Sequence, residues 1–176
     1  GDIAAALING LQQEGVGASL KHFAANNSEY RRTEMDSIID ERALREIYLA
    51  GFQRAIAKSR PWTVMSSYNR LNGVQTSQDP FLLTQVLRDE WGYEGLVMSD
   101  WYGIKDRPAS LMAGNDLAMP ETRRDKQTLL AAIEVAAAGI FPPGSIPDHI
   151  RSDFTPVGKL HEAVQNGLLW MALDQD

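Results

Sequence analysis

The sequence predicts an α/β fold in which short parallel strands are covered by helices. Strand candidates alternate with helix candidates at intervals of roughly 30 to 45 residues, the spacing of right-handed βαβ crossovers. The strand candidates are also apolar runs without polar alternation, which is typical of strands buried on both faces. Four such strands would form either an open sheet or about half of an eight-stranded barrel.

The composition is that of a soluble globular domain. The chain has 176 residues, 44% of them hydrophobic, with a formal charge of −6 and no cysteine. The charge and the lack of a basic cluster argue against nucleic acid or an anionic membrane as partner. No apolar run reaches the roughly 18 residues that span a bilayer. Without cysteine there is no disulfide or thiolate, and three scattered histidines give no metal motif.

Local signals place the individual elements. Asp40 is a helix cap, Pro80 suits a first helical turn, and Asn72-Gly73 predicts a tight turn. Helices are predicted over 3–11, 41–58, 80–91, 108–113, 123–138 and 157–166, and strands over 16–23, 61–68, 95–99 and 116–120. The helix 41–58 should turn one apolar face inward: Leu44, Ile47, Tyr48, Gly51, Phe52, Ala55 and Ile56.

Polar and aromatic side chains follow the predicted strands. The run 95–99 ends at Asp100 and Trp101, an earlier strand ends near Lys21 and His22, and a third ends at Tyr68. The carboxyl ends of parallel strands meet at one edge of a sheet or barrel, so these side chains should meet in space. Asp100 is therefore the leading candidate for chemistry.

Four sequence blocks stand out: residues 21–29 (KHFAANNSE), 41–49 (ERALREIYL), 64–69 (VMSSYN) and 95–101 (GLVMSDW). Together and in this order they resemble glycoside hydrolase family 3, in its β-glucosidase branch. The segment 113–120 resembles the family's stretch after the nucleophile, and 158–169 resembles the last helix of its barrel. The resemblance implies that residues 1–176 are part of an N-terminal (β/α)8 TIM-barrel-like domain. It also implies that the first barrel strands and a C-terminal α/β domain lie outside this chain.

The resemblance further implies a retaining glycosidase mechanism, which needs a carboxylate nucleophile and a second carboxyl group as acid and base. Asp100 matches the family's nucleophile. Residues that match sugar contacts or would wall the subsite are Lys21, His22, Arg32, Met65, Tyr68 and Trp101. The family's acid and base lies in the domain outside this chain, and spacing alone selects none of Glu29, Glu34 and Glu121 as a substitute. No cofactor is implied.

Simpler structural explanations compete with these assignments. An Asp after a strand often caps the next helix, and a lone histidine is often a core residue. Arg32 can pair with Glu29 or Glu34, and Met65 can serve as core packing. Lys21 alone would be a surface cation.

The functional expectation is a β-glucosidase-type hydrolase, or a fragment of one, acting on a β-glucoside or short β-glucan oligosaccharide. A β-xylosidase of the same family is the near alternative. A glycan-binding or assembly module without turnover is the alternative from another class. Half a barrel leaves open strand edges, so self-association or association with a complementing fragment is expected. The resemblance favours a periplasmic or extracellular location.

Overall fold

The computed structural model describes residues 1–120 and 122–140. The chain divides into two units, Gly1–Leu129 and Leu130–Asp176, and the fold given below is that of the first. Helix α5 (Arg123–Ile140) begins within it. The helix predicted at 157–166 and the segment 141–156 lie outside the described residues. None of the helices in the described part is long and apolar enough to cross a membrane.

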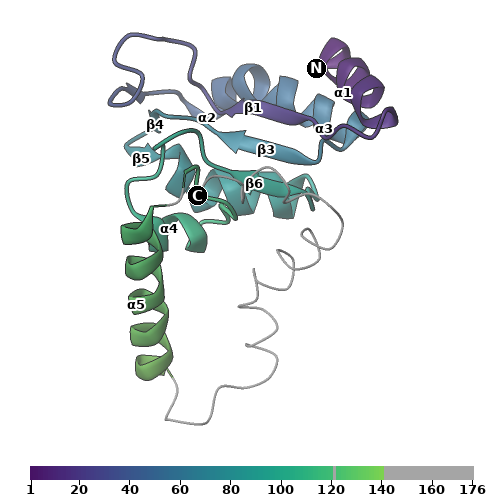
Figure 1. The fold of residues 1–176 in the computed structure, drawn as a ribbon. Coiled ribbons are helices and arrows are strands. Elements are labelled where there is room, and N and C mark those ends of the chain that lie inside the picture. The colour runs from purple at the N-terminus through teal and green to yellow at the C-terminus, as the bar shows by residue number, and fades with distance from the viewer. Residues whose placement is uncertain (121, 141–176) are drawn as a thin grey trace. The chain divides into compact units, whose positions relative to one another are not determined.

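A three-stranded parallel sheet forms the centre of the first unit. Its strands are β1 (Ser19–Phe23), β3 (Thr63–Ser66) and β6 (Leu96–Met98), in the order β1-β3-β6. Both neighbouring pairs are parallel, and helical segments connect them (Figure 1). The predicted α/β class is confirmed. The described strands form an open sheet and do not by themselves close a barrel.

The core lies between this sheet and the helices that connect its strands. Val64 and Val97, on adjacent strands, are fully buried. The helix η3 (Phe81–Glu90) buries an apolar face against them, made of Leu82, Leu83, Val86 and Leu87. Burying such a side chain contributes about 1.5–3 kcal/mol, so this face anchors the connection that leads into β6.

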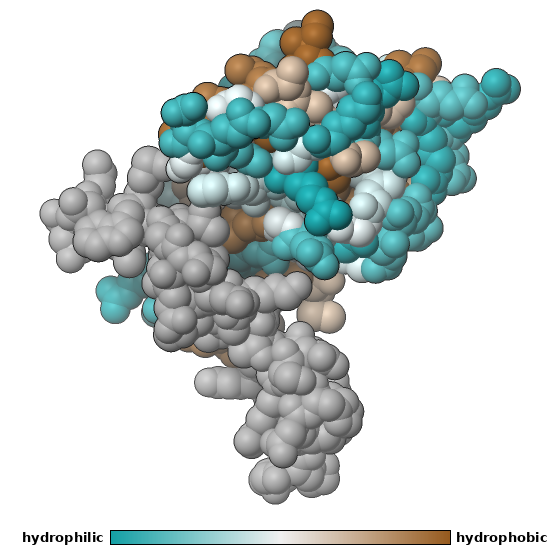
Figure 2. Space-filling view, turned by 90° about the vertical axis from the view of Figure 1, so that its right-hand side faces the viewer, coloured by the Kyte–Doolittle hydropathy of each residue, from teal (hydrophilic) through white to brown (hydrophobic). Residues whose placement is uncertain are grey.

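Helix α1 (Asp2–Gln13) packs on the sheet side through Ala5 and Ile8. Its outer face also carries apolar residues, because Ile3 is 88% and Leu7 is 64% exposed. Figure 2 views the molecule from the side on which α1 lies in Figure 1, and shows apolar patches on an otherwise hydrophilic face. The helix predicted over 3–11 is therefore present, and it runs from residue 2 to residue 13.

The helix predicted over 41–58 runs from residue 41 to 59 in three segments. These are α2 (Glu41–Ala43), the π-helical η1 (Leu44–Leu49) and α3 (Ala50–Ser59). The Asp40 side chain accepts the Ala43 N–H at 3.0 Å, which confirms the predicted cap. The predicted inward face is partly wrong: Ile47 is 70% exposed and Leu49 is buried. A π turn holds more residues than an α turn, so it rotates the register of everything after it.

A second, small sheet was not predicted. It contains β2 (Asp36–Ser37), β4 (Arg70–Leu71) and β5 (Val74–Gln75), in the order β2-β4-β5. β4 and β5 are antiparallel and are joined by Asn72 and Gly73, both with positive φ (50° and 89°). That is the backbone of a two-residue hairpin turn, so the predicted turn is correct. The 3-10 turn η2 (Thr76–Gln78) follows β5 directly.

The strand predicted over 116–120 is not present. After α4 (Arg107–Met112) the chain makes only an isolated bridge between Leu117 and Met98. The N–H groups of Asp116 and Leu117 both donate to the carbonyl of Val97, and the Met119 N–H donates to the Ser99 hydroxyl instead of to backbone. In a β ladder each backbone N–H pairs with its own backbone carbonyl on the neighbouring strand. Here two N–H groups share one carbonyl and a third donates to a side chain, so no ladder forms.

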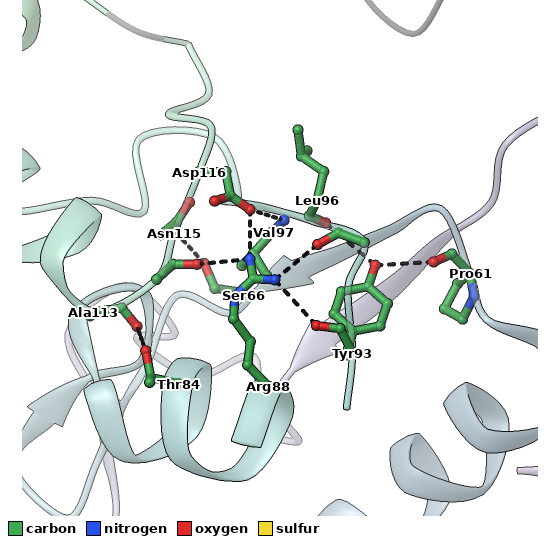
Figure 3. Close-up of polar contacts among 12 residues, drawn as sticks. Pro61, Ser66, Thr84, Arg88, Tyr93, Leu96, Val97, Ala113, Asn115 and Asp116 are labelled. Carbon is green, nitrogen blue, oxygen red and sulfur yellow. Dashed lines mark hydrogen bonds and ion pairs between the residues drawn. The ribbon is translucent and has the colours of Figure 1, made fainter. Parts of the chain in front are cut away.

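A polar network centred on Arg88 joins η3, β6 and the segment that follows α4 (Figure 3). The Arg88 guanidinium contacts the Asp116 carboxylate at 2.7 Å, and Asp116 also accepts the Val97 N–H at 2.8 Å. Arg88 donates further bonds to three backbone carbonyls, those of Tyr93, Gly95 and Gly114. A Cβ at Gly95 would collide with the Tyr93 hydroxyl, which explains glycine at the entrance to β6.

We predict that Arg88→Met lowers the free energy of unfolding by about 2–3 kcal/mol, because it leaves the Asp116 carboxylate and several carbonyls without their charged donor. Chemical denaturation measures this. Arg45→Met is the matched control: Arg45 pairs with Glu41 and Glu90 at the surface, where loss of an ion pair costs about 1 kcal/mol or less. Equal losses in the two variants would contradict the prediction.

Candidate active site

Three predicted site residues meet at the carboxyl edge of the parallel sheet. His22 lies near the end of β1, Tyr68 follows β3 by two residues, and Asp100 follows β6 by two residues. The strands run parallel and side by side, so their ends deliver these side chains to one place. The predicted convergence is therefore present for these three.

The Asp100 carboxylate is the centre of this group. Its Oδ2 lies 3.2 Å from His22 Nε2, and its Oδ1 accepts the Trp101 N–H at 2.7 Å. The Tyr68 hydroxyl lies close enough to the same carboxylate for Asp100 to raise the tyrosine pKa. The side chain is 13% exposed. Asp100 is therefore a largely covered carboxylate with several donors around it, and it caps no described helix.

His22 contacts Asp100 with an imidazole whose pKa is lowered. Burial lowers its pKa below 6.5, the positive charge of Lys21 lowers it further, and the charge of Asp100 opposes both. Nε2 is the nitrogen that faces the carboxylate, 3.2 Å from its Oδ2. The lowered pKa keeps the imidazole mainly neutral at neutral pH, so this contact adds little positive charge to the site.

Tyr68 is a second neutral neighbour of the Asp100 carboxylate. Burial, the hydrogen bond to Asp100 and the charge of Asp100 raise its pKa above 10, against the opposing charge of Arg32. The Arg32 guanidinium lies over the Tyr68 ring, 5.0 Å from its centroid, and pairs with Glu29 at 2.9 Å. Arg32 thus makes the predicted ion pair with Glu29 and also lies beside the site.

The other predicted residues border this group in different ways. Lys21 is exposed and close enough to His22 to lower its pKa. The pairing of β1 with β3 changes register between Leu20 and Phe23, so strict alternation of side chains does not apply at Lys21 and His22. Met65 lies within β3 and is only 9% exposed, whereas Trp101 is 49% exposed. Met65 thus packs in the core at the sheet edge.

A hollow of about 560 Å³ lies beside Lys21 and His22. Its wall combines polar groups with apolar and aromatic ones: Lys21, His22, Ala25, Asn26, Asn27, Ile47, Tyr48 and Phe52. Such a mixed lining is typical of ligand sites. Two of these residues come from the π-helical η1, so the irregular helix contributes to the hollow.

The structure does not single out a second catalytic carboxylate in the described part of the chain. Glu29 is paired with Arg32, and Glu34 is paired with Arg31. Glu121 lies outside the described residues. Within the described ranges, no group of three or more His, Cys, Asp or Glu side chains is placed to hold a metal ion.

Sequence reasoning missed the segment Gln75–Gln78. Its side chains bond the backbone of the loops that carry Tyr68 and Asp100. No sequence pattern marks these residues, because amides and hydroxyls after a hairpin turn usually face solvent.

The described geometry is that of a known family. Residues 1–152 match the model of the glycosyl hydrolase family 3 N-terminal domain. This chain belongs to that family. Its N-terminal domain is a TIM-barrel-like α/β fold, of which the described residues contribute three parallel strands.

Several characterised relatives are similar over most of this chain. The chain is 54% identical over 131 residues, 74% of its length, to an exo-alpha-(1->6)-L-arabinopyranosidase of Bifidobacterium breve, of which it covers 17%. It is 56% identical over 119 residues, 68% of its length, to thermostable beta-glucosidase B of Acetivibrio thermocellus, of which it covers 16%. The chain thus spans about a sixth of these relatives.

A solved structure agrees with this assignment. Beta-glucosidase 3B from Thermotoga neapolitana in complex with glucose superposes with a TM-score of 0.73 at 49% identity. The match covers 75% of this chain and 20% of that one. At this level of identity the similarity concerns the sequence as well as the fold.

We predict a pH dependence from His22. Its pKa in the folded chain lies below the unfolded value of 6.5, so below that pH the unfolded chain binds more protons. The free energy of unfolding should therefore fall as the pH drops from about 6.5 through the folded pKa, and His22→Gln should flatten this slope. Denaturation between pH 7.5 and 5 tests it, and NMR gives the imidazole pKa directly. An imidazole pKa above 6.5 would contradict it.

Proposed function

We propose that this chain is part of a retaining β-glucosidase-type glycoside hydrolase that cleaves non-reducing-end β-D-glucosyl residues, with Asp100 as nucleophile. The supporting observation is the covered Asp100 carboxylate at the carboxyl edge of the sheet, 3.2 Å from His22 and beside the Tyr68 hydroxyl, whose pKa it raises. Family membership supports the reaction class.

In this proposal an Asp100 oxygen attacks the anomeric carbon as the glycosidic bond breaks, giving a glycosyl ester that water then hydrolyses. His22 and Tyr68, both neutral, hold the carboxylate in one orientation by donating to it. Hydrogen bonds to an ionised acceptor are about twice as strong as neutral ones, which makes two such donors an effective restraint. Lys21, Arg32 and Trp101 would border the sugar, and the buried Met65 would line the floor of the same subsite from the core.

The proposed acid and base comes from outside the described residues. We place residues 1–176 in the N-terminal (β/α) barrel domain of a longer protein, and the remaining domain would supply that carboxyl group. General acid assistance is typically worth about 10²–10⁴ in rate. An activated aryl leaving group needs little of it, so it is the suitable substrate for this chain.

The names of the relatives support the proposed substrate class. Several of them are named β-glucosidases, and solved relatives hold glucose. Another relative of this chain, the arabinopyranosidase from Bifidobacterium breve, is named for a pentose and not for glucose. Hydrolysis rates on an aryl β-glucoside, an aryl β-xyloside and an aryl α-L-arabinopyranoside would therefore show which sugar the site prefers.

The decisive experiment is covalent trapping at Asp100. We predict that a 2-fluoro β-glucoside with a dinitrophenyl leaving group adds one glycosyl mass to the chain, located at Asp100 by peptide mass spectrometry. Asp100→Ala should abolish labelling, and Tyr68→Phe should slow it by about 10- to 100-fold through loss of a charge-assisted hydrogen bond.

Asp89→Asn is the control for this experiment, because Asp89 is exposed on η3 and should leave labelling unchanged. Glucose binding without any adduct would favour the non-catalytic glycan-binding alternative. An adduct on a different carboxylate would refute the assignment of Asp100.

We also propose that the chain associates with a second copy of itself when no complementing segment is present. The outer edge of β1 pairs with no described strand, and the neighbouring α1 exposes Ile3 and Leu7. Exposed edges and apolar faces favour such pairing. We predict a dimer by light scattering at micromolar concentration, weakened by Leu7→Lys and unaffected by the control Met112→Lys. A monodisperse monomer at every concentration would contradict this.

A further inference from the structure

The segment Gln75–Gln78, formed by the end of β5 and by η2, holds two loops together. One is the loop after β3, which carries Tyr68, and the other is the loop after β6, which carries Asp100 and continues through Gly103. Each of the four side chains in the segment bonds to backbone of these loops or of their immediate continuation. The segment thus lies where it can fix the distance between two site residues.

Three of the four side chains each form hydrogen bonds to only one of the two loops. The Thr76 hydroxyl donates to the Ser67 carbonyl at 2.7 Å, on the side of Tyr68. The Ser77 hydroxyl donates to the Gly103 carbonyl at 3.0 Å, on the side of Asp100. The Gln78 side-chain oxygen accepts the N–H groups of the next residues of that second loop, Lys105 and Asp106, at 2.9 and 3.0 Å.

Gln75 bridges the two loops. Its Nε2 donates to the Tyr68 carbonyl at 2.7 Å and to the Gly103 carbonyl at 3.1 Å. A side-chain amide has two N–H groups, so both bonds form at the same time. The Gly103 N–H in turn donates to the Asp100 carbonyl at 2.9 Å. A short path of hydrogen bonds thus leads from the backbone of Tyr68 to the backbone of Asp100 through one amide.

We infer that Gln75 is a positioning residue for the glycosidase reaction, which sets the place of the Tyr68 hydroxyl relative to the Asp100 carboxylate by tying their two loops together. The inference rests on the proposed function, because only a reacting Asp100 needs to be positioned. A nucleophile must be held within a fraction of an ångström of its productive position. Loops that are not tied together by such hydrogen bonds cannot hold it with that precision.

The ionisation of Tyr68 reports on this position without any turnover. The groups that act on its hydroxyl are the Asp100 carboxylate and the Arg32 guanidinium, together with burial. If the two loops separate, Tyr68 loses its bond to Asp100 and part of its cover. Both losses lower the tyrosine pKa, whereas a change confined to the hairpin would leave it as it is.

The experiment compares Gln75→Met, Gln75→Asn and Ser77→Ala. Methionine keeps the length of the side chain without a donor, and asparagine keeps the donors but is one methylene too short to reach both carbonyls. Ser77→Ala is the matched control, since it removes one bond to the same Gly103 carbonyl and leaves Tyr68 untouched. Tyrosine labelled with ¹³C at Cζ gives each pKa by NMR, and the Tyr68→Phe spectrum assigns the signal among the five tyrosines.

We expect the Tyr68 pKa to fall by roughly 0.5–1 unit in both Gln75 variants, the equivalent of one lost hydrogen bond, and to stay within about 0.2 unit in Ser77→Ala. The rate of trapping by the 2-fluoro glucoside should fall in the same two variants. An unchanged Tyr68 pKa in the Gln75 variants, or an equal fall in Ser77→Ala, would overturn the inference.

Two further outcomes are also decisive. Loss of the fold in both Gln75 variants, with Ser77→Ala still folded by circular dichroism, would make Gln75 a structural residue and overturn the positioning role. If the unmodified chain is not trapped at Asp100, the proposed function fails. The tyrosine titration then still shows whether Gln75 ties the two loops.

Discussion

The ion pair between Arg88 and Asp116 is the interaction on which the position of the site depends. Arg88 reaches from η3 to the carbonyls at the start of β6, while Asp116 accepts the Val97 N–H in the middle of that strand. The following residues then bond Ser99 through Leu117 and Met119. Asp100 is the next residue. The carboxylate at the sheet edge is therefore placed by a network that lies beneath it and does not touch the site.

The charge balance at the sheet edge favours a carboxylate that remains available. His22 and Tyr68 both lie beside Asp100 as neutral groups at neutral pH, so neither brings a full positive charge to it. Arg32 brings a full positive charge, but it lies over the Tyr68 ring and is paired with Glu29. In the proposed reaction, a cation paired directly with Asp100 would stabilise the ground state of the attacking carboxylate and slow the attack. In the described geometry the Arg32 cation contacts the Tyr68 ring and pairs with Glu29, and it forms no ion pair with Asp100.

The sequence allowed the prediction of those features that depend on neighbours in the chain. Asp40 caps its helix, and Asn72-Gly73 turns a hairpin, because caps and turns are decided within about four residues. The meeting of His22, Tyr68 and Asp100 followed from parallel strands. The strand predicted at 116–120 is absent because the side chains of Asp116 and Ser99 accept backbone N–H groups that a β ladder would pair with carbonyls. Gln75 escaped notice because its role depends on two loops brought together only by the tertiary fold.

The π-helical turns of η1 have an effect beyond the helix itself. In a regular α-helix Ile47 would share the inward face with Leu44, and the core would absorb it. The wider turns give that place to Leu49 and leave Ile47 and Tyr48 in the wall of the hollow next to His22. The π turns thus leave the Ile47 side chain exposed in the wall of that hollow, while Tyr48 lines the same wall and still packs partly against the core.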